Sequence, residues 1–206
     1  LFRSHVALAL VFQQEGEVKS AEQHFRSALA VAPNNARILN NYGAFLLEQQ
    51  RYSEALTYFT KASEDTFYGE RSRVFENLGL TYQKLDRPEE ARASFERALR
   101  LNSRQPLALL EMARIEFESE NYVPAWNYYL SFTQLSAQNA SSLWLGVQLG
   151  WHLPALRIFE QTVAGIVPGF VVQSHFNPLA WQVVFVTGLL LGAADTRGKM
   201  DWNGWF

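Results

Sequence analysis

The sequence predicts an all-α solenoid in which four helical hairpins stack in order and a ninth helix follows them. The first observation is a repeat with separations of 34, 36 and 34 positions, which places small residues at Ala21, Ala55, Ala91 and Ala125. The second is an aromatic ring four positions after each of them, at Phe25, Phe59, Phe95 and Tyr129. A period in this range is typical of a repeat array, and because a single hairpin cannot bury its apolar face, the units must stack.

Three further columns complete the pattern within each repeat. Three positions after the aromatic ring stand Ala28, Ala62, Ala98 and Phe132. The preceding helix carries its own small residue, at Ala9, Gly43, Gly79 and Ala113, and just before it Leu8, Tyr42, Leu78 and Met112. Small residues let two helices approach closely, and the ring fills the space between one hairpin and the next. A period of 34 is that of the tetratricopeptide repeat, so we predict a tetratricopeptide-repeat superhelical solenoid.

The repeats organise residues 1–149 as one domain. We place them at about 2–35, 36–71, 72–105 and 106–139, with a partial fifth at 140–149. Breaks such as "QEGEVKSAE" and "KLDRPEEAR" separate the two helices of a unit. Pro33 ends the first unit, and Pro88 suits the first turn of a helix. The two extra residues of the second unit fall in a loop near Gly69, and the Leu145-Gly146 pair marks the ninth helix in "NASSLWLGVQLG".

Residues 150–206 form a tail of different composition. Charged residues are absent between Gln161 and Ala194, and sixteen uncharged residues, Leu179–Ala194, run together. The tail carries no second-helix pattern for a fifth repeat. Three interpretations remain open: a buried capping helix, a membrane-associated segment shorter than the roughly 20 residues of a straight span, or a segment not native to this fold.

Composition excludes several classes of function. The chain has no cysteine, which excludes disulfides, thiolate zinc sites and cysteine nucleophiles. The formal net charge of -2 argues against a nucleic-acid partner. The histidines have no metal-binding spacing, and we interpret each as a surface or packing residue: His5, His24, His152 and His175. No nucleophile elbow or phosphate loop occurs. We therefore expect no enzyme, no cofactor and no metal.

Three stretches resemble one particular family. They are Asn40 to Gly43 (Asn-Asn-Tyr-Gly), Glu76 to Gly79 (Glu-Asn-Leu-Gly), and "LNSRQPLALLEMARIEFESENYVPAWNYY" at 101–129. With their surroundings they look like the type IV pilus biogenesis and stability proteins of the PilF/PilW type. The resemblance covers about residues 1–149, and it is more specific than the generic repeat.

The resemblance implies a pilotin, a non-enzymatic protein that binds the pilus secretin and promotes its outer-membrane localisation and multimer assembly. It implies a monomer at the periplasmic face of the outer membrane, held there by a lipid anchor. The chain begins at Leu1, within an expected helix, and has no cysteine. We therefore expect that the anchor and at least one early repeat are missing from it. The alternative function is a general tetratricopeptide adaptor in another cell-envelope or signalling complex.

In this fold the first helices of the repeats line a concave groove, which we predict to bind the partner. The residues at its register positions are Arg3, Val6, Leu10, Arg37, Asn40, Asn41, Ala44, Arg73, Glu76, Asn77, Leu80 and Arg114. Arg3, Arg37 and Arg73 stand in register, and a guanidinium offers a bidentate fork to carboxylates. The competing interpretation is solvated arginines paired with a nearby Glu70 or Glu76. A chaperone-type carboxylate clamp is incomplete, because Val6 and Leu10 occupy its first-repeat places.

Overall fold

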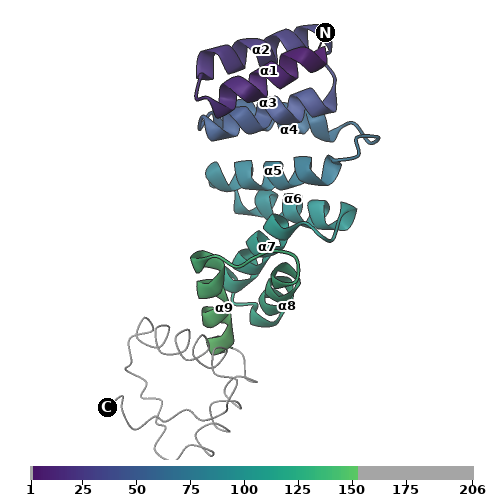
Figure 1. Ribbon diagram of the computed structural model, residues 1–206. Coiled ribbons are helices and arrows are strands. Elements are labelled where there is room, and N and C mark those ends of the chain that lie inside the picture. Colours follow the sequence, from purple (N-terminus) through teal and green to yellow (C-terminus); the bar gives the residue numbers. More distant parts are fainter. Residues whose placement is uncertain (1, 153–206) are drawn as a thin grey trace, which may run out of the picture. The chain divides into compact units, whose positions relative to one another are not determined.

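The computed structural model describes residues 2–152, which form helices and turns and contain no strand (Figure 1). The first helices of the hairpins are α1 (Phe2–Gln14), α3 (Ala36–Glu48), α5 (Arg71–Lys84) and α7 (Pro106–Glu118). The second helices are α2 (Val18–Val31), α4 (Tyr52–Ser63), α6 (Pro88–Leu101) and α8 (Tyr122–Thr133), and α9 (Ala140–His152) follows them. The predicted all-α array of four hairpins and a ninth helix is therefore confirmed for the described part of the chain.

The repeat columns form the core of each hairpin. All four small residues of the second helices are completely buried, and so are Phe25, Phe59 and Phe95. At Gly79 an added Cβ would lie 2.5 Å from the Phe95 ring, and at Gly43 it would lie 2.7 Å from Phe59. These distances are shorter than a carbon–carbon contact allows, so the glycines provide the space that the rings occupy.

Each first helix ends in the same way. The residue after its last turn has a positive φ, at Gly16 (77°), Gln50 (61°), Asp86 (56°) and Glu120 (61°). The amide of the following residue then donates to a carbonyl five positions back, as Arg51 does to Leu46 at 2.9 Å. This is the Schellman arrangement, which satisfies the terminal carbonyls of a helix. Three of the four left-handed positions are not glycine, and such a residue costs about 1 kcal/mol.

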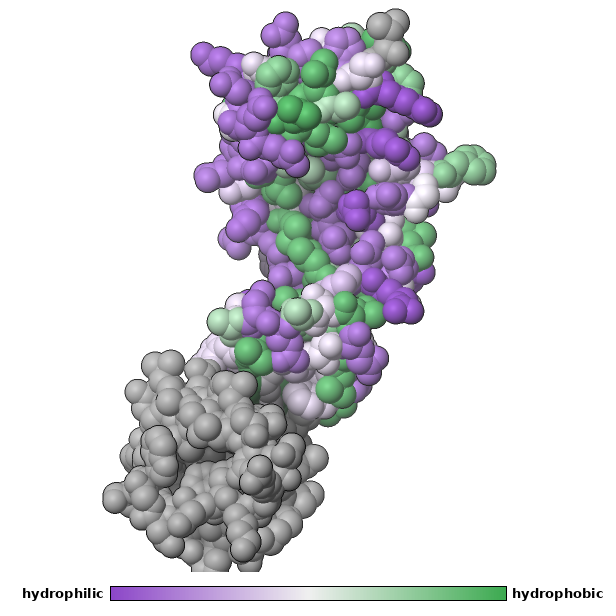
Figure 2. Space-filling model, viewed as in Figure 1, coloured by the Kyte–Doolittle hydropathy of each residue, from purple (hydrophilic) through white to green (hydrophobic). Residues whose placement is uncertain are grey.

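Aromatic rings join the first repeat to the second. Phe25 of α2 packs against Tyr42 and Phe45 of α3, with ring centroids 5.6 and 5.4 Å apart. Leu8 and Val11 occupy the same register on α1 as Tyr42 and Phe45 on α3, but they are 44% and 47% exposed. Figure 2 shows apolar residues gathered over these N-terminal helices on a face that is otherwise mostly polar.

The chain divides into two compact units, Leu1–Ser142 and Leu143–Phe206. In the first unit Asn139 begins α9, because its side-chain oxygen accepts a hydrogen bond of 2.9 Å from the Ser142 amide. In the second unit the described residues are those of α9 from Leu143 onward. The interpretations of the tail concern residues that lie almost wholly outside the described part. Within residues 2–152, none of the helices is both long and apolar enough for a membrane span.

Candidate partner-binding surface

The structure places all twelve predicted groove residues on the first helices of the hairpins: α1, α3, α5 and α7. They differ in exposure. Arg3, Leu10, Arg37 and Arg73 are exposed, whereas Val6, Asn41, Ala44, Glu76, Asn77, Leu80 and Arg114 are partly buried and Asn40 is buried. Ala44 and Leu80 pack against the hydrophobic core. The exposed members are therefore the ones best placed to meet a partner directly.

Several polar residues of this face link neighbouring repeats. The Asn77 amide donates to the Asn40 side-chain oxygen at 3.0 Å, joining α5 to α3. The Gln83 amide donates to Glu111 at 3.0 Å and joins α5 to α7. Arg114 donates to the Ser141 hydroxyl at 2.6 Å and joins α7 to the start of α9. Asn40, Asn77 and Arg114 thus hold the repeats together, which is a structural role that their sequence positions did not reveal.

Glu76 reaches from α5 to the first turn of α7. Its carboxylate accepts a hydrogen bond of 3.3 Å from the Ala108 amide, and nearby Gln105 donates to the Ser72 hydroxyl at 2.9 Å. Burial raises the pKa of the Glu76 carboxyl, while the Ala108 amide and Arg73 act in the opposite direction. A glutamate from the preceding repeat therefore takes the place of an N-terminal cap for α7, at some expense in desolvation.

The raised pKa predicts how stability changes with pH. Below the ordinary pKa of 4.5 the carboxyl is protonated in both the folded and the unfolded chain. As the pH rises through the raised pKa of the folded state, the folded chain has to hold a charged carboxylate in a buried place, and stability is lost.

We expect the free energy of unfolding of Glu76→Gln, minus that of the parent, to be larger at pH 7 than at pH 4. Urea denaturation at the two pH values measures this difference. Ser72→Ala, in the same junction, should differ from the parent by the same amount at both pH values. A Glu76→Gln difference that shrinks with pH would contradict the assignment.

Two of the three predicted arginines share a neighbour that the sequence did not indicate. Arg37 and Arg73 both lie close enough to Tyr68 to oppose the rise in its pKa, which burial causes first and Glu70 second. Arg73 also pairs with Glu70 at 2.9 Å, and both side chains are more than half exposed. An exposed pair of this kind contributes little to stability, so Arg73 remains available to a stronger partner. We name Arg37, Tyr68 and Arg73 the arginine–tyrosine cluster.

The loop between α4 and α5 contributes Tyr68 to this cluster and carries the two extra residues of the second repeat. Phe67 is 97% exposed. The loop is nevertheless fixed by hydrogen bonds, because the Asp65 carboxylate accepts from the Phe67 amide at 3.0 Å and Arg71 donates to the Ser63 carbonyl at 2.8 Å. Figures 1 and 2 show this loop projecting from the stack. The sequence signalled this loop only by the change in spacing from 34 to 36 residues. Spacing alone does not show which side chain of the loop is exposed to solvent.

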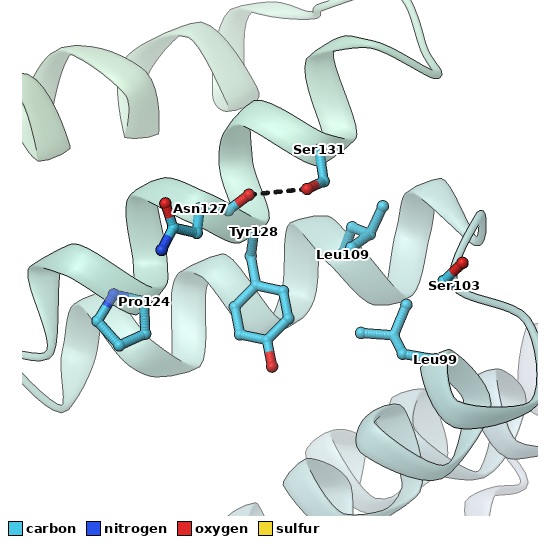
Figure 3. Close-up of a pocket in the computed structure, with 7 residues that line it drawn as sticks. All are labelled: Leu99, Ser103, Leu109, Pro124, Asn127, Tyr128 and Ser131. Atoms are coloured by element: carbon cyan, nitrogen blue, oxygen red, sulfur yellow. Dashed lines mark hydrogen bonds between the residues drawn. The ribbon is translucent and has the colours of Figure 1, made fainter.

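A pocket of about 450 Å³ opens on the side of the second helices, between α6 and α8 (Figure 3). Leu99, Leu109 and Tyr128 contribute apolar surface to its lining, and Asn127 and Ser131 contribute polar groups. The Ser131 hydroxyl donates to the Asn127 carbonyl at 2.9 Å. This pocket is lined mainly by second-helix residues and contains none of the predicted groove residues, so it lies apart from the predicted binding face.

These features define a class of protein, a tetratricopeptide-repeat scaffold with an exposed side-chain array on its first helices. Sequence profiles described as tetratricopeptide repeat match residues 4–39, 34–104 and 77–140. The type IV pilus assembly protein PilF of Pseudomonas aeruginosa is 53% identical over 146 residues, which are 71% of this chain and 58% of that protein. The chain thus spans less than two thirds of the length of that relative.

Solved structures agree with this relationship. A structure of Pseudomonas aeruginosa PilF matches with a TM-score of 0.72 and 46% identity, covering 82% of this chain and 77% of that one. A structure of PilW, described as a widely conserved type IV pilus biogenesis factor, matches with a TM-score of 0.66 over 88% and 82% of the two chains. Its 24% identity supports the shared fold alone. The chain belongs to the PilF family of tetratricopeptide-repeat proteins.

Proposed function

We propose that this protein is a type IV pilus biogenesis factor, a pilotin that binds a subunit of the pilus secretin and promotes its assembly into multimers at the outer membrane. The 53% identity to a type IV pilus assembly protein carries the proposal. The scaffold acts by protein–protein contact and without catalysis, at the periplasmic face of the outer membrane. In the proposed mechanism, a captured secretin segment is kept from misassembling until it reaches that membrane.

The arginine–tyrosine cluster is where we place the capture. Arg37 and Arg73 are exposed and supply bidentate donors for carboxylates or backbone carbonyls of the secretin segment. Phe67 is next to Tyr68 on the same loop and offers an exposed aromatic anchor of the kind that dominates interface energetics. The remaining predicted residues of the first helices form the surface along which the segment continues.

The state of the secretin in a deletion strain tests the function. Membranes are fractionated and blotted for heat-stable secretin multimers and for monomers, with and without the intact gene supplied from a plasmid. Loss of multimers that the gene restores is the expected result. Normal multimers in the deletion strain would overturn the secretin assignment and leave an adaptor for another cell-envelope or signalling complex.

Reversing the charges of the cluster tests its role in capture. Arg37→Glu together with Arg73→Glu is expected to weaken binding of the purified protein to the secretin subunit at least tenfold, because two donors become repulsive toward acidic or carbonyl partners. Titration calorimetry at low salt measures the affinity. The matched control is Arg100→Glu with Arg104→Glu, which makes the same change in net charge on exposed residues at the end of α6 and just beyond it. Equal affinity of both variants and the parent would remove the cluster from the proposal.

A further inference from the structure

The first hairpin brings together two histidines that are 19 positions apart in the sequence. His5 lies on α1 and His24 on α2, and both side chains are partly buried. Their Nδ1 atoms are 3.2 Å apart, and their ring centroids are 5.5 Å apart. The separation along the sequence gave no sign of this pairing, because the two residues meet through the packing of two helices.

The distance between the nitrogens suits a shared metal ion. Zinc–imidazole bonds are about 2.0–2.1 Å long, so two nitrogens on one tetrahedral ion lie about 3.3 Å apart. Without an ion, one ring donates an N–H hydrogen bond to the other ring at this separation. Two neutral imidazoles at this distance therefore present two nitrogens at a separation that a metal ion can bridge.

The surroundings hold the His24 ring in place and bring the two helices close together. Phe12 of α1 stacks on His24 with an interplanar angle of 7° and a centroid distance of 5.4 Å. The two helices are drawn close by Ala9 and Ala21, which are completely buried. Each histidine is therefore carried by a helix of the same hairpin, and both rings are already adjacent before an ion binds.

We propose that His5 and His24 form a two-imidazole site for a divalent first-row transition ion. Imidazole nitrogen is a ligand for copper, nickel and zinc, and affinity at such a site rises to a maximum at Cu²⁺. No group of three or more potential ligands occurs among residues 2–152. The ion accordingly keeps open positions that water fills, which makes it exchangeable rather than a closed structural centre.

The site joins α1 to α2, so an ion bound there favours the folded hairpin. A ligand that binds the native state alone, at a free concentration one hundred times its dissociation constant, lowers the unfolding equilibrium constant about a hundredfold. Metal binding is therefore expected to raise the midpoint of thermal unfolding of the whole chain. The effect is independent of the secretin and of the proposed function.

The test uses the full chain without an affinity tag and adds Ni²⁺ or Cu²⁺ at pH 7.5. Titration calorimetry gives the stoichiometry, thermal unfolding gives the shift in midpoint, and electron paramagnetic resonance of the Cu²⁺ form reports nitrogen ligands. His5→Gln and His24→Gln are compared with a control in which the other two histidines, His152 and His175, are both replaced by Gln. Because His5→Gln leaves the Phe12–His24 stack intact, it carries the test if His24→Gln fails to fold.

We expect saturable binding of one ion per chain, with two nitrogen ligands, and a rise in the midpoint of thermal unfolding. The control should show the same binding and the same rise. Each single variant of the pair should lose at least tenfold in affinity and most of the shift. Equal binding by the parent and His5→Gln, or loss of binding in the control alone, would overturn the proposal. The absence of saturable binding to the parent would do so as well.

Discussion

Replacing Phe95 by alanine is expected to lower the free energy of unfolding by about 3–5 kcal/mol, the usual loss for a fully buried phenylalanine. The ring is completely buried and lies directly over Gly79, so no larger side chain of α5 is available there to fill the space. The neighbouring repeats contact this hairpin on both sides, and in a solenoid its loss also weakens their interfaces. Urea denaturation followed by circular dichroism measures the change.

The matched control is the same substitution at an exposed position. Phe67 is 97% exposed, so Phe67→Ala removes a ring that makes almost no contact with the folded chain. We expect its free energy of unfolding to stay within about 0.5 kcal/mol of the parent. Similar losses in Phe67→Ala and Phe95→Ala would mean that the repeat core does not depend on the ring column.

Replacing Arg92 by leucine is expected to lower the free energy of unfolding by about 3 kcal/mol, near the lower end for a broken buried ion pair. Arg92 of α6 pairs with Glu116 of α7, whose side chain is 9% exposed. The side-chain amide of Asn121 also donates to the Glu116 carboxylate, at 2.9 Å. Without Arg92, the Glu116 carboxylate keeps its charge between two repeats, where little water reaches it and no cation among the described residues pairs with it, so the folded state is destabilised.

The double variant Arg92→Leu with Glu116→Leu separates the unpaired charge from lost packing. Removing both charges is expected to restore most of the stability, because a buried pair is often replaceable by apolar residues. Arg26→Leu is the surface control: Arg26 pairs with Glu22 on the same helix and its side chain is 66% exposed, so a change of at most about 0.5 kcal/mol is expected. A double variant no more stable than Arg92→Leu would refute this account of the pair.

Part of the candidate surface was accessible from the sequence. The register assigned its residues to the first helices, and the structure confirms those helices. The register did not distinguish residues that face solvent from residues that hydrogen-bond to a neighbouring repeat. Arg37 and Arg73 face solvent, whereas Asn40 and Asn77 bond to each other at 3.0 Å. The role of all twelve residues in partner binding stays a prediction.

By itself the sequence determined the repeat: the helix order, the small residues and the rings. These features follow from local periodicity and side-chain size, which every hairpin must satisfy in the same way to stack on its neighbour. The tertiary structure alone decided the polar pairs, His5 with His24, Asn40 with Asn77 and Arg92 with Glu116, which are 19, 37 and 24 positions apart. Their separations share no period, because each pair depends on how two particular helices pack and on which rotamers the two side chains adopt.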